Sequence, residues 1–565
     1  MKDFISFKFL PKKIIKNLFL FLFFLVLLSS FFKINTNNWF MFLSLVLTGI
    51  PAIILHKETI NKKKPEKKTK KSKEKILLII ILVLFSILLL KNLGRLDFKE
   101  DEFQVTAAAT TYLYEKNFYK WDYMKKISGK NTNCVENDKF CNYTRAFPHT
   151  WLIAQSYKIF GISEWSSRIV SVLFGVIFII LVYYISLFFT DNKGVSLAIM
   201  TIAGLMPCYI EMFRYTRMYA LLAPLSLLAI YLSYKSFFEE QNKKTILKKK
   251  ESVFKKITEI NYKYFLLLIP LSLFSLLIHA NFAIITLSTL FFIFFLGIDG
   301  RNKKYSYWSI IILIPSLILI NFLPKKINYF LSFFEVRNYE YLYEFLNEPF
   351  SWSLSLFLII SAPLIAFLKK TRNKKIYFLT TIISISLLFF VFVADRYYSF
   401  MYMSHILSLS IILTIFSLFN ISKIYNKTIK ILIFISVAFL IIFNFSESYQ
   451  KLYTNNDHGQ YSKIYPEIIE KIKEDEAVFM QYPRFYYLQD TNKKINIIDI
   501  EKNKEYKIDR FLEDKKRYKG YWFVWETKKN YHISEDLKSY IQENFTKIHG
   551  DGIDNYGIEV FYLRN

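Results

Sequence analysis

Four carboxylates crowd into six residues at the start of a polar segment. Asp97, Glu100, Asp101 and Glu102 follow an apolar run in the stretch LGRLDFKEDEF (93–103). Acidic side chains this close repel one another, which raises some of their pKa values and makes a good proton acceptor. A helix start is the simpler explanation, because Asp97 or Asp101 would suit an N-cap and the helix dipole. A cap needs one acid, so the cluster favours a general base.

Two arginines stand in the segment PCYIEMFRYTRMYALLAP. Arg214 and Arg217 are three residues apart, so a helix would present both on one face. Arginine at the end of a membrane span often only extends its charge to the interface. A guanidinium also binds phosphate through two parallel hydrogen bonds, so the pair suits an anionic headgroup. A third arginine, Arg396, lies beside Tyr397 in VFVADRYYSF.

A histidine lies in the segment TRAFPHTWLIAQSYKIFGISEWSSRIVSVLFG (144–174). His149 follows Pro148 at the beginning of an amphipathic stretch. Trp151 and Trp165 need no catalytic explanation, because tryptophan is enriched at membrane interfaces. We interpret His149 as either an interfacial polar residue or a substrate contact.

The elements that must position these residues are apolar spans. The chain has 565 residues, is 53% hydrophobic and 19% aromatic, and has a net charge of +29. Apolar stretches of about 15–20 residues recur between Lys-rich connectors, so the bilayer is the expected solvent. The lysines form no basic face interleaved with aromatics, so nucleic acid is not an expected partner. The predicted spans are 17–32, 39–55, 76–91, 169–189, 194–210, 218–234, 264–279, 282–297, 307–323, 352–368, 376–393, 403–419 and 430–444.

The basic connectors predict an orientation for this integral protein of the cell membrane. Connectors 57–75, 235–263, 299–304 and 369–375 are strongly basic. Placing all of them in the cytoplasm, beside anionic membrane lipids, makes the thirteen spans mutually consistent. The N-terminus is then cytoplasmic, the C-terminus is extracytoplasmic, and the loop 92–168 is on the outer face. The first span lacks a small-residue cleavage site, so we expect an anchor.

The last part of the chain changes character. The apolar spans stop, and short strand-like runs (EAVFMQY, KINIIDI, YWFVWE and GIEVFYL) alternate with helical-period stretches. That alternation predicts a small α/β domain. The expected architecture is an α-helical polytopic membrane protein in three parts: two helices and a Lys-rich cytoplasmic loop at 1–75, a transmembrane core at 76–444, and an extracytoplasmic α/β domain at 445–565.

Cysteine and metal chemistry have little support in the sequence. Cys134 and Cys141 share one polar loop and would pair only in an oxidising compartment, while Cys208 lies in an apolar span. No CxxC pair or HExxH stretch offers a metal framework, so no cofactor and no metal site is predicted.

Carboxylates and arginines on one face suit sugar transfer from a polyprenyl-phosphate donor. Such a donor carries its own leaving group, so the enzyme has to deprotonate an acceptor hydroxyl and neutralise the departing phosphate. No nucleotide-binding glycine loop is needed, and the sequence shows none.

At these residues the sequence resembles the GT-C superfamily of integral-membrane glycosyltransferases. It is most similar to the branch of protein O-mannosyltransferases and lipid A aminoarabinose transferases. The matching pieces are the Asp101-Glu102 pair after a span, P-H-T-W-L with F-G-x-S-E-x-x-x-R, R-Y-T-R-M-Y-A-L, and the later R-Y-Y. The resemblance implies a GT-C fold from about residue 76 to residue 420 and direct displacement with inversion at the anomeric carbon.

The resemblance also implies roles for single residues. Asp101 becomes the base and Glu102 its neighbour. The expected contacts to the substrate and the carrier phosphate are Arg214, Arg217, Tyr219, Arg396 and Tyr397, to which the residue pattern adds His149. The implied partners are a polyprenyl-phosphate-linked sugar donor and a glycan, lipid or protein acceptor.

Some features depart from the family pattern and keep alternatives open. Two spans precede the core, and no proline lies near R-Y-Y. The tail has no lectin-like repeat, and this absence favours a lipid-linked or cell-surface glycan as the acceptor over a protein. A metal-dependent oligosaccharyltransferase would need a WWD-type stretch, for which YWFVWE is a poor substitute. A lipid or solute transporter would need Gly/Pro-broken spans with charges at mid-membrane, whereas here charges concentrate at span ends.

Overall fold

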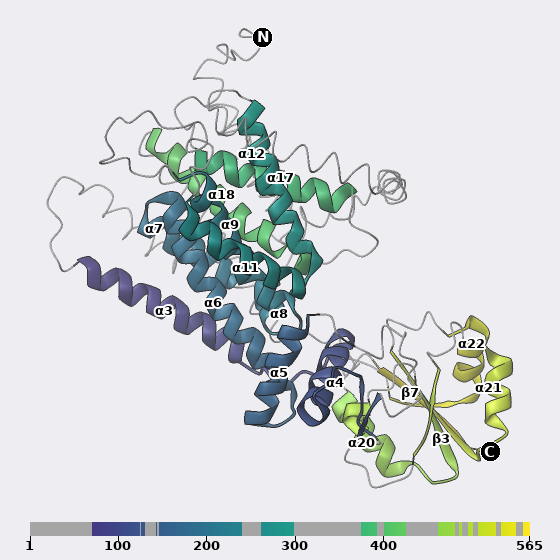
Figure 1. The fold of residues 1–565 in the computed structure, drawn as a ribbon. Coiled ribbons are helices and arrows are strands. Elements are labelled where there is room, and N and C mark those ends of the chain that lie inside the picture. Colours follow the sequence, from purple (N-terminus) through teal and green to yellow (C-terminus); the bar gives the residue numbers. More distant parts are fainter. Residues whose placement is uncertain are drawn as a thin grey trace, which may run out of the picture. The chain divides into compact units, whose positions relative to one another are not determined.

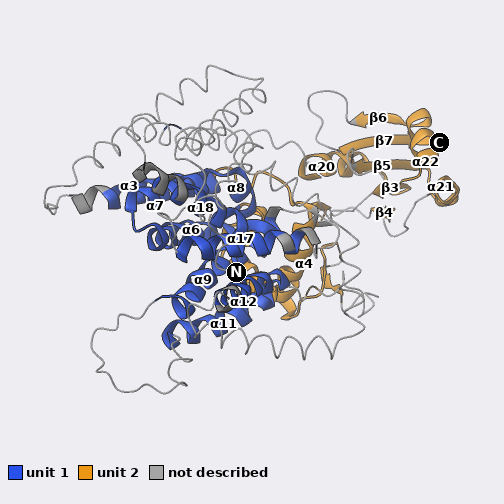
Figure 2. Cartoon of the chain, turned by 90° about the horizontal axis from the view of Figure 1, so that it is seen from above, with its two compact units in different colours: residues 1–89, 171–213, 218–448 blue, residues 90–170, 214–217, 449–565 orange. Residues whose placement is uncertain are grey.

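The computed structural model describes the chain in separate stretches. These are residues 70–124, 126–129, 143, 146–239, 261–298, 374–392, 400–424, 435, 461–480, 485–488, 495–500, 507–526, 533–549 and 558–564. The predicted spans 17–32, 39–55, 307–323 and 352–368 lie outside them, as does the span 430–444 apart from residue 435. The chain divides into two compact units, coloured separately in Figure 2: unit 1 is 1–89, 171–213 and 218–448, and unit 2 is 90–170, 214–217 and 449–565.

Unit 1 is built from apolar helices in its described residues (Figure 1). They are α3 (Lys70–Leu90), α6 (Glu164–Thr190), α7 (Lys193–Leu205), α8 (Pro207–Phe213), α9 (Tyr219–Phe237), α11 (Tyr262–Ile278), α12 (Ala283–Ile298), α17 (Lys374–Phe392) and α18 (Ser404–Ile424), with short 3₁₀ turns η2 (Ala280–Phe282) and η3 (Phe400–Met403). The first residues of α6 and the last of α3 belong to unit 2. Within the described stretches, α6 and α9 are long and apolar enough to cross a membrane, and the bent α7–α8 pair is a third candidate. The helical prediction is confirmed at these positions, and the count of thirteen spans stays a prediction.

The span predicted at 194–210 is bent. Helices α7 and α8 meet at 65°. Pro207 has no backbone N–H, and its ring disfavours helical conformation at the preceding residue. Met206 accordingly adopts extended dihedrals, with φ −66° and ψ 127°. The chain leaves α8 at Phe213 and enters the turn 214–217.

Unit 2 begins with two helices that pack against each other, α4 (Glu100–Glu115) and α5 (Phe147–Phe160). A short antiparallel pair, β1 (Trp121–Asp122) with β2 (Ile127–Ser128), follows α4. Helix α4 ends at Glu115, and the next residue, Lys116, has the left-handed φ of 59°. Helix α5 has Pro148 in its first turn, where the missing N–H costs no helical bond.

The tail of unit 2 is a mixed five-stranded sheet with helices. Its strand order is β4 (Asn496–Asp499), β3 (Glu476–Met480), β5 (Gly520–Glu526), β7 (Ile558–Arg564), β6 (Thr546–His549). Strand β3 pairs in parallel with β4 and β5, and β7 pairs antiparallel with β5 and β6. The strand-like runs seen in the sequence coincide with β3, β4, β5 and β7.

Both faces of this sheet are covered within unit 2. On one face Phe479 and Phe523 pack with α21 (Ile508–Lys515) and α22 (Glu535–Asn544). On the other face Val478 and Val524 pack with α20 (Tyr461–Lys471). Successive residues of a strand point to opposite faces, so a strand buried on both sides is apolar throughout, as β3 is in Glu476–Met480 except at its first residue.

Candidate active site

Glu102 lies in the first turn of α4 and is fully buried. Its Oε1 accepts hydrogen bonds from Arg168 Nε at 3.0 Å and from the Thr216 backbone N–H at 2.7 Å. Its Oε2 accepts from Arg168 Nη2 at 2.7 Å and from the Lys99 backbone N–H at 2.8 Å. Burial alone would raise the pKa of Glu102, but the charge and hydrogen bonds of Arg168 and the two backbone donors outweigh it and lower the pKa. All four hydrogen bonds hold Glu102 as a fixed anion.

Arg168 forms the other half of this buried ion pair. Its side chain is 5% exposed. Besides Glu102, it donates from Nη1 to the Leu93 and Leu96 carbonyls at 3.1 and 2.6 Å, and from Nη2 to the Asp97 carbonyl at 2.9 Å. The guanidinium therefore ties the segment before α4 to the beginning of α6.

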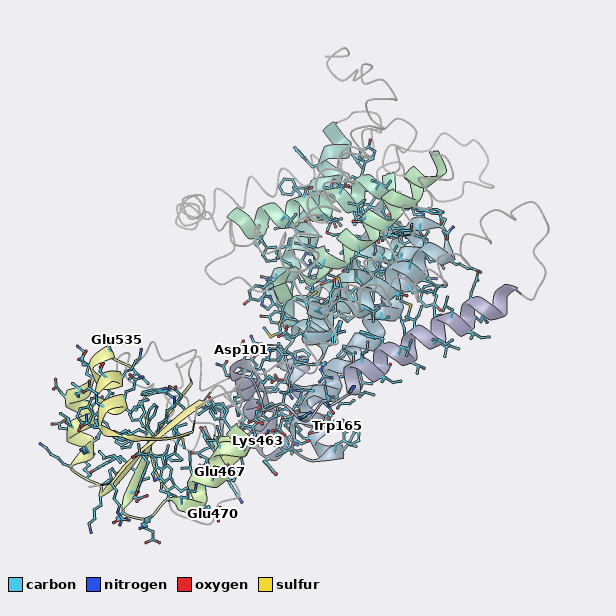
Figure 3. All side chains as sticks on the ribbon, turned by 180° about the vertical axis from the view of Figure 1, so that it is seen from behind. Asp101, Trp165, Lys463, Glu467, Glu470 and Glu535 are labelled. Carbon is cyan, nitrogen blue, oxygen red and sulfur yellow. The ribbon has the colours of Figure 1, made fainter. Side chains whose placement is uncertain are left out.

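Asp101, labelled in Figure 3, precedes Glu102 on α4 and has a different environment. Its side chain is 53% exposed, and its Oδ2 lies 3.2 Å from Arg217 Nη1, whose side chain is only 12% exposed. Arg217 Nη1 also donates to the Asp101 carbonyl at 3.3 Å. A carboxylate that is open to solvent and oriented by one cation can still accept a proton from a substrate hydroxyl.

Arg214 is held by the backbone that follows α3. Its Nη1 donates to the Lys91 carbonyl at 2.6 Å and its Nη2 to the Asn92 carbonyl at 3.4 Å. Burial, together with the charge of Arg168, lowers the pKa of Arg214 to about 10, so it remains charged at neutral pH. Arg168, Arg214 and Arg217 thus bring three guanidinium groups to this part of unit 2.

Among the described residues, the buried polar atoms of unit 2 without a hydrogen-bond partner include His149 Nε2, Thr150 Oγ1 and Thr216 Oγ1. Unpaired buried polar atoms are costly, and they mark places where water or a ligand completes the hydrogen bonding. Burial, with a smaller effect of the Arg217 charge, lowers the pKa of His149 to about 3. His149 is therefore neutral at physiological pH and able to bind an uncharged hydroxyl group.

The predicted site residues are distributed as follows. Asp101, Glu102, His149, Arg214 and Arg217 all belong to unit 2. Tyr219 belongs to unit 1, where it is buried and its ring lies 5.3 Å from that of Tyr402 and 5.5 Å from that of His279. Arg396 and Tyr397 lie outside the described residues. Within the described residues no group of three or more His, Cys, Asp or Glu side chains is arranged to hold a metal ion.

One local expectation was wrong. Arg214 and Arg217 do not share a helical face, because α8 ends at Phe213 and α9 begins at Tyr219. In the turn between them the Arg217 N–H donates to the Tyr215 carbonyl, and the Thr216 N–H is taken by the Glu102 carboxylate. The segment therefore cannot make regular helical hydrogen bonds.

The helix cap, which was the simpler explanation of the acidic cluster, is formed by other residues. Neither Asp97 nor Asp101 caps α4, because Lys99 occupies the N-cap position and Glu102 bonds back to the Lys99 N–H. This is the Glu half of a capping box. Asp97 instead accepts hydrogen bonds from Ser462.

Sequence reasoning missed Arg168 and Ser462 as parts of the site. Arg168 was visible as the arginine of F-G-x-S-E-x-x-x-R at the entrance of an apolar span, but its partner lies 66 residues away. Ser462 is 365 residues from Asp97, and no local pattern marks it. Thr216 was overlooked because it contributes its backbone N–H.

Comparison with known proteins gives a partial match. The family profile described as "Dolichyl-phosphate-mannose-protein mannosyltransferase" matches residues 144–248. The resemblance to GT-C glycosyltransferases is thereby confirmed over a segment that contains His149, Arg168, Arg214 and Arg217. No curated protein matches the chain.

Two solved structures resemble the chain at low identity. They are ArnT from Cupriavidus metallidurans in the apo state and bound to undecaprenyl phosphate. Each is 10% identical, and each match covers 86% of this chain and 97% of that chain. The TM-scores are 0.47 and 0.46.

Replacing Glu102 by Gln should strongly destabilise unit 2. The change leaves the buried Arg168 charge unpaired, and breaking such a pair costs about 3–5 kcal/mol. Thermal unfolding of the detergent-solubilised protein measures the loss. The double variant Glu102→Leu with Arg168→Met is the control: it removes the unpaired charge but leaves the backbone groups that the pair bonds without partners, so it should recover part of the stability. A Glu102→Gln protein as stable as wild type would contradict the structural role of the pair.

His149 should make stability depend on pH in acid. Below pH 6.5 the unfolded chain binds a proton at His149. In the folded protein His149 is protonated only near pH 3, because its pKa is lowered to about 3. Stability is therefore full above pH 6.5, and this residue removes up to about 1.4 kcal/mol per pH unit as pH falls through that window. His149→Gln should flatten the slope of the unfolding free energy between pH 6 and pH 4. Equal slopes in the two proteins would show that His149 is not held neutral.

Proposed function

We propose that this protein is a membrane glycosyltransferase that moves a sugar from a polyprenyl-phosphate monosaccharide to an acceptor hydroxyl. The observation that most supports this proposal is the pair of adjacent carboxylates. Glu102 is buried and fully hydrogen-bonded, while Asp101 is half-exposed beside Arg217. The profile that matches residues 144–248 describes enzymes that use dolichyl-phosphate-mannose, which supports this class of donor.

In the proposed reaction Asp101 is the base. It takes the proton of the acceptor hydroxyl while that oxygen attacks the anomeric carbon from the side opposite the phosphate. The bond between the anomeric carbon and the phosphate oxygen breaks, and its electron pair leaves with the polyprenyl phosphate. The anomeric configuration is inverted in this single displacement. Glu102 takes no proton and keeps the first turn of α4 in place.

The cations are proposed to stabilise the leaving phosphate. Negative charge grows on the phosphate as the glycosidic bond breaks, so a nearby guanidinium stabilises the transition state more than the bound donor. Among the residues that the structure describes, Arg217 and Arg214 are the candidates for this contact to the phosphate. Arg396, Tyr397 and Tyr219 are proposed as further contacts to the carrier phosphate.

The proposed orientation follows from the basic connectors. It places the N-terminus in the cytoplasm and unit 2, with its α/β tail, on the outer face, where a lipid-linked glycan, a cell-surface glycan or a protein would be the acceptor. Neutral His149 is proposed to bind a sugar hydroxyl.

Transfer of labelled sugar from a panel of polyprenyl-phosphate monosaccharides to acceptors in host membranes tests this function. Asp101→Asn should fold normally and bind donor, but its kcat should fall by about 10² or more, since a positioned base contributes that much. Asp536→Asn, on an exposed residue of α22, is the matched control and should keep full activity. Near-normal turnover in Asp101→Asn removes Asp101 from the role of base, and no transfer by wild type from any donor refutes the function.

Arg217→Gln tests the phosphate contact. Removing one strong charge-stabilising donor should lower kcat/KM by an amount that corresponds to about 2–4 kcal/mol of lost transition-state stabilisation. It should also weaken binding of polyprenyl phosphate itself. Arg517→Gln, at a mostly exposed arginine of the tail, is the control for loss of one positive charge. If donor kinetics and carrier binding are unchanged in Arg217→Gln, this arginine neither contacts the phosphate nor orients the base, and it serves only to anchor the turn.

A further inference from the structure

The three residues before α4 are each fixed by a different contact. The Asp97 carboxylate accepts two hydrogen bonds from Ser462, from Oγ at 2.6 Å and from the backbone N–H at 2.7 Å. The Phe98 N–H donates to the Tyr487 hydroxyl at 2.7 Å. The Lys99 N–H donates to Glu102 at 2.8 Å. Two of the three contacts come from the tail of unit 2.

Asp97 also lies at the N-terminus of α20, whose second residue is Ser462. The free N–H groups and the positive end of the helix dipole favour a carboxylate at that position. Asp97 is 6% exposed, and burial raises its pKa although the Ser462 hydrogen bonds oppose that effect. A buried carboxylate needs these donors, so the contact is specific and not a surface encounter.

Aromatic packing extends the same contact into the first turn of α4. The Phe98 ring lies 5.1 Å from Tyr486, and the Phe103 ring lies 5.9 Å from Tyr487, both edge-to-face. Phe98 precedes Asp101 and Glu102 in sequence and Phe103 directly follows them, so the tail contacts the chain on both sides of these two carboxylates.

The tail is itself a rigid support for these groups. Helix α20 buries Ile464, Tyr465 and Ile468 against one face of the five-stranded sheet. Tyr461, at its first position, stacks on Tyr487 with ring centroids 6.4 Å apart. Lys463, Glu467 and Glu470, labelled in Figure 3, are exposed residues of this helix, and they alternate along it with the buried ones. A helix fixed on a sheet holds its N-terminal groups in one place.

We propose that the α/β tail positions the base of the transfer reaction, with Ser462 and Tyr487 as its positioning residues. This inference rests on the proposed function, because Asp101 is the group being positioned. Ser462 holds Asp97 and Tyr487 holds Phe98. Asp101 lies in α4, only three residues after Phe98. Loss of either contact lets the segment 97–99 shift and carries the first turn of α4 with it. Catalysis is sensitive to such shifts, since a displacement of about 1 Å can cost 10²-fold in rate.

The test compares single-atom changes in the tail. Ser462→Ala and Tyr487→Phe each remove one hydroxyl, Ser462→Thr keeps the hydroxyl, and Ser534→Ala is the matched control. Ser534 also stands at the start of a tail helix, α22, and its hydroxyl has no partner among the described residues. Transfer kinetics are measured with the best donor of the polyprenyl-phosphate panel, and amide hydrogen exchange is followed in the peptide 97–103.

The positioning role predicts a split between kinetic parameters. Ser462→Ala and Tyr487→Phe should lower kcat about 10- to 100-fold, leave the donor KM within about 3-fold, and speed exchange of the 97–103 amides about 10-fold or more. Ser462→Thr should restore kcat, and Ser534→Ala should behave as wild type in both measurements.

Two results would overturn the inference while leaving the proposed function intact. One is wild-type kcat and wild-type exchange in Ser462→Ala and Tyr487→Phe. The other is a loss of activity that equals the loss of folded protein, or that appears equally in Ser534→Ala. Failure of the proposed function looks different, because wild-type protein then transfers no sugar from any donor. The exchange measurement still decides in that case whether the tail holds residues 97–103.

Discussion

The buried ion pair between Glu102 and Arg168 is the interaction on which the site depends. Both charges have left water, and such a transfer is tolerated only when every donor and acceptor finds a partner. Glu102 takes two bonds from the guanidinium and two from backbone N–H groups, while Arg168 also binds three backbone carbonyls before α4. Three pieces of chain that are distant in sequence, namely residues 93–102, Arg168 and Thr216, are thereby held around one carboxylate.

This constraint separates two neighbouring acids into different kinds of group. Consecutive residues of a helix point in directions about 100° apart, so Glu102 turns inward while Asp101 remains half-exposed. Different surroundings allow a protein to give two neighbouring carboxylates different tasks. The guanidinium groups of Arg214 and Arg217 are likewise fixed, one by backbone carbonyls and one by Asp101.

Local sequence pattern was enough for some of this organisation. Apolar runs located α6 and α9, and short strand-like runs located β3 and β5. It was insufficient wherever a tertiary hydrogen bond decided the local structure. The turn 214–217 resembles a helix in composition, yet its Thr216 N–H is bonded to Glu102 and its Arg217 N–H to the Tyr215 carbonyl. Nothing near Asp97 in sequence reveals that its donors come from α20.

The contact between Asp97 and Ser462 also bears on the order in which the protein is made. The two residues are separated by 365 positions, so the segment before α4 is synthesised long before its partner. At 5–20 residues per second the ribosome needs about 20–70 s to cover that distance. Throughout that interval the acidic cluster has no donors from α20, because the tail does not yet exist. A chain cut short before residue 461 would therefore carry every carboxylate and arginine of the described site and still lack its final arrangement, so completion of the site is coupled to completion of translation.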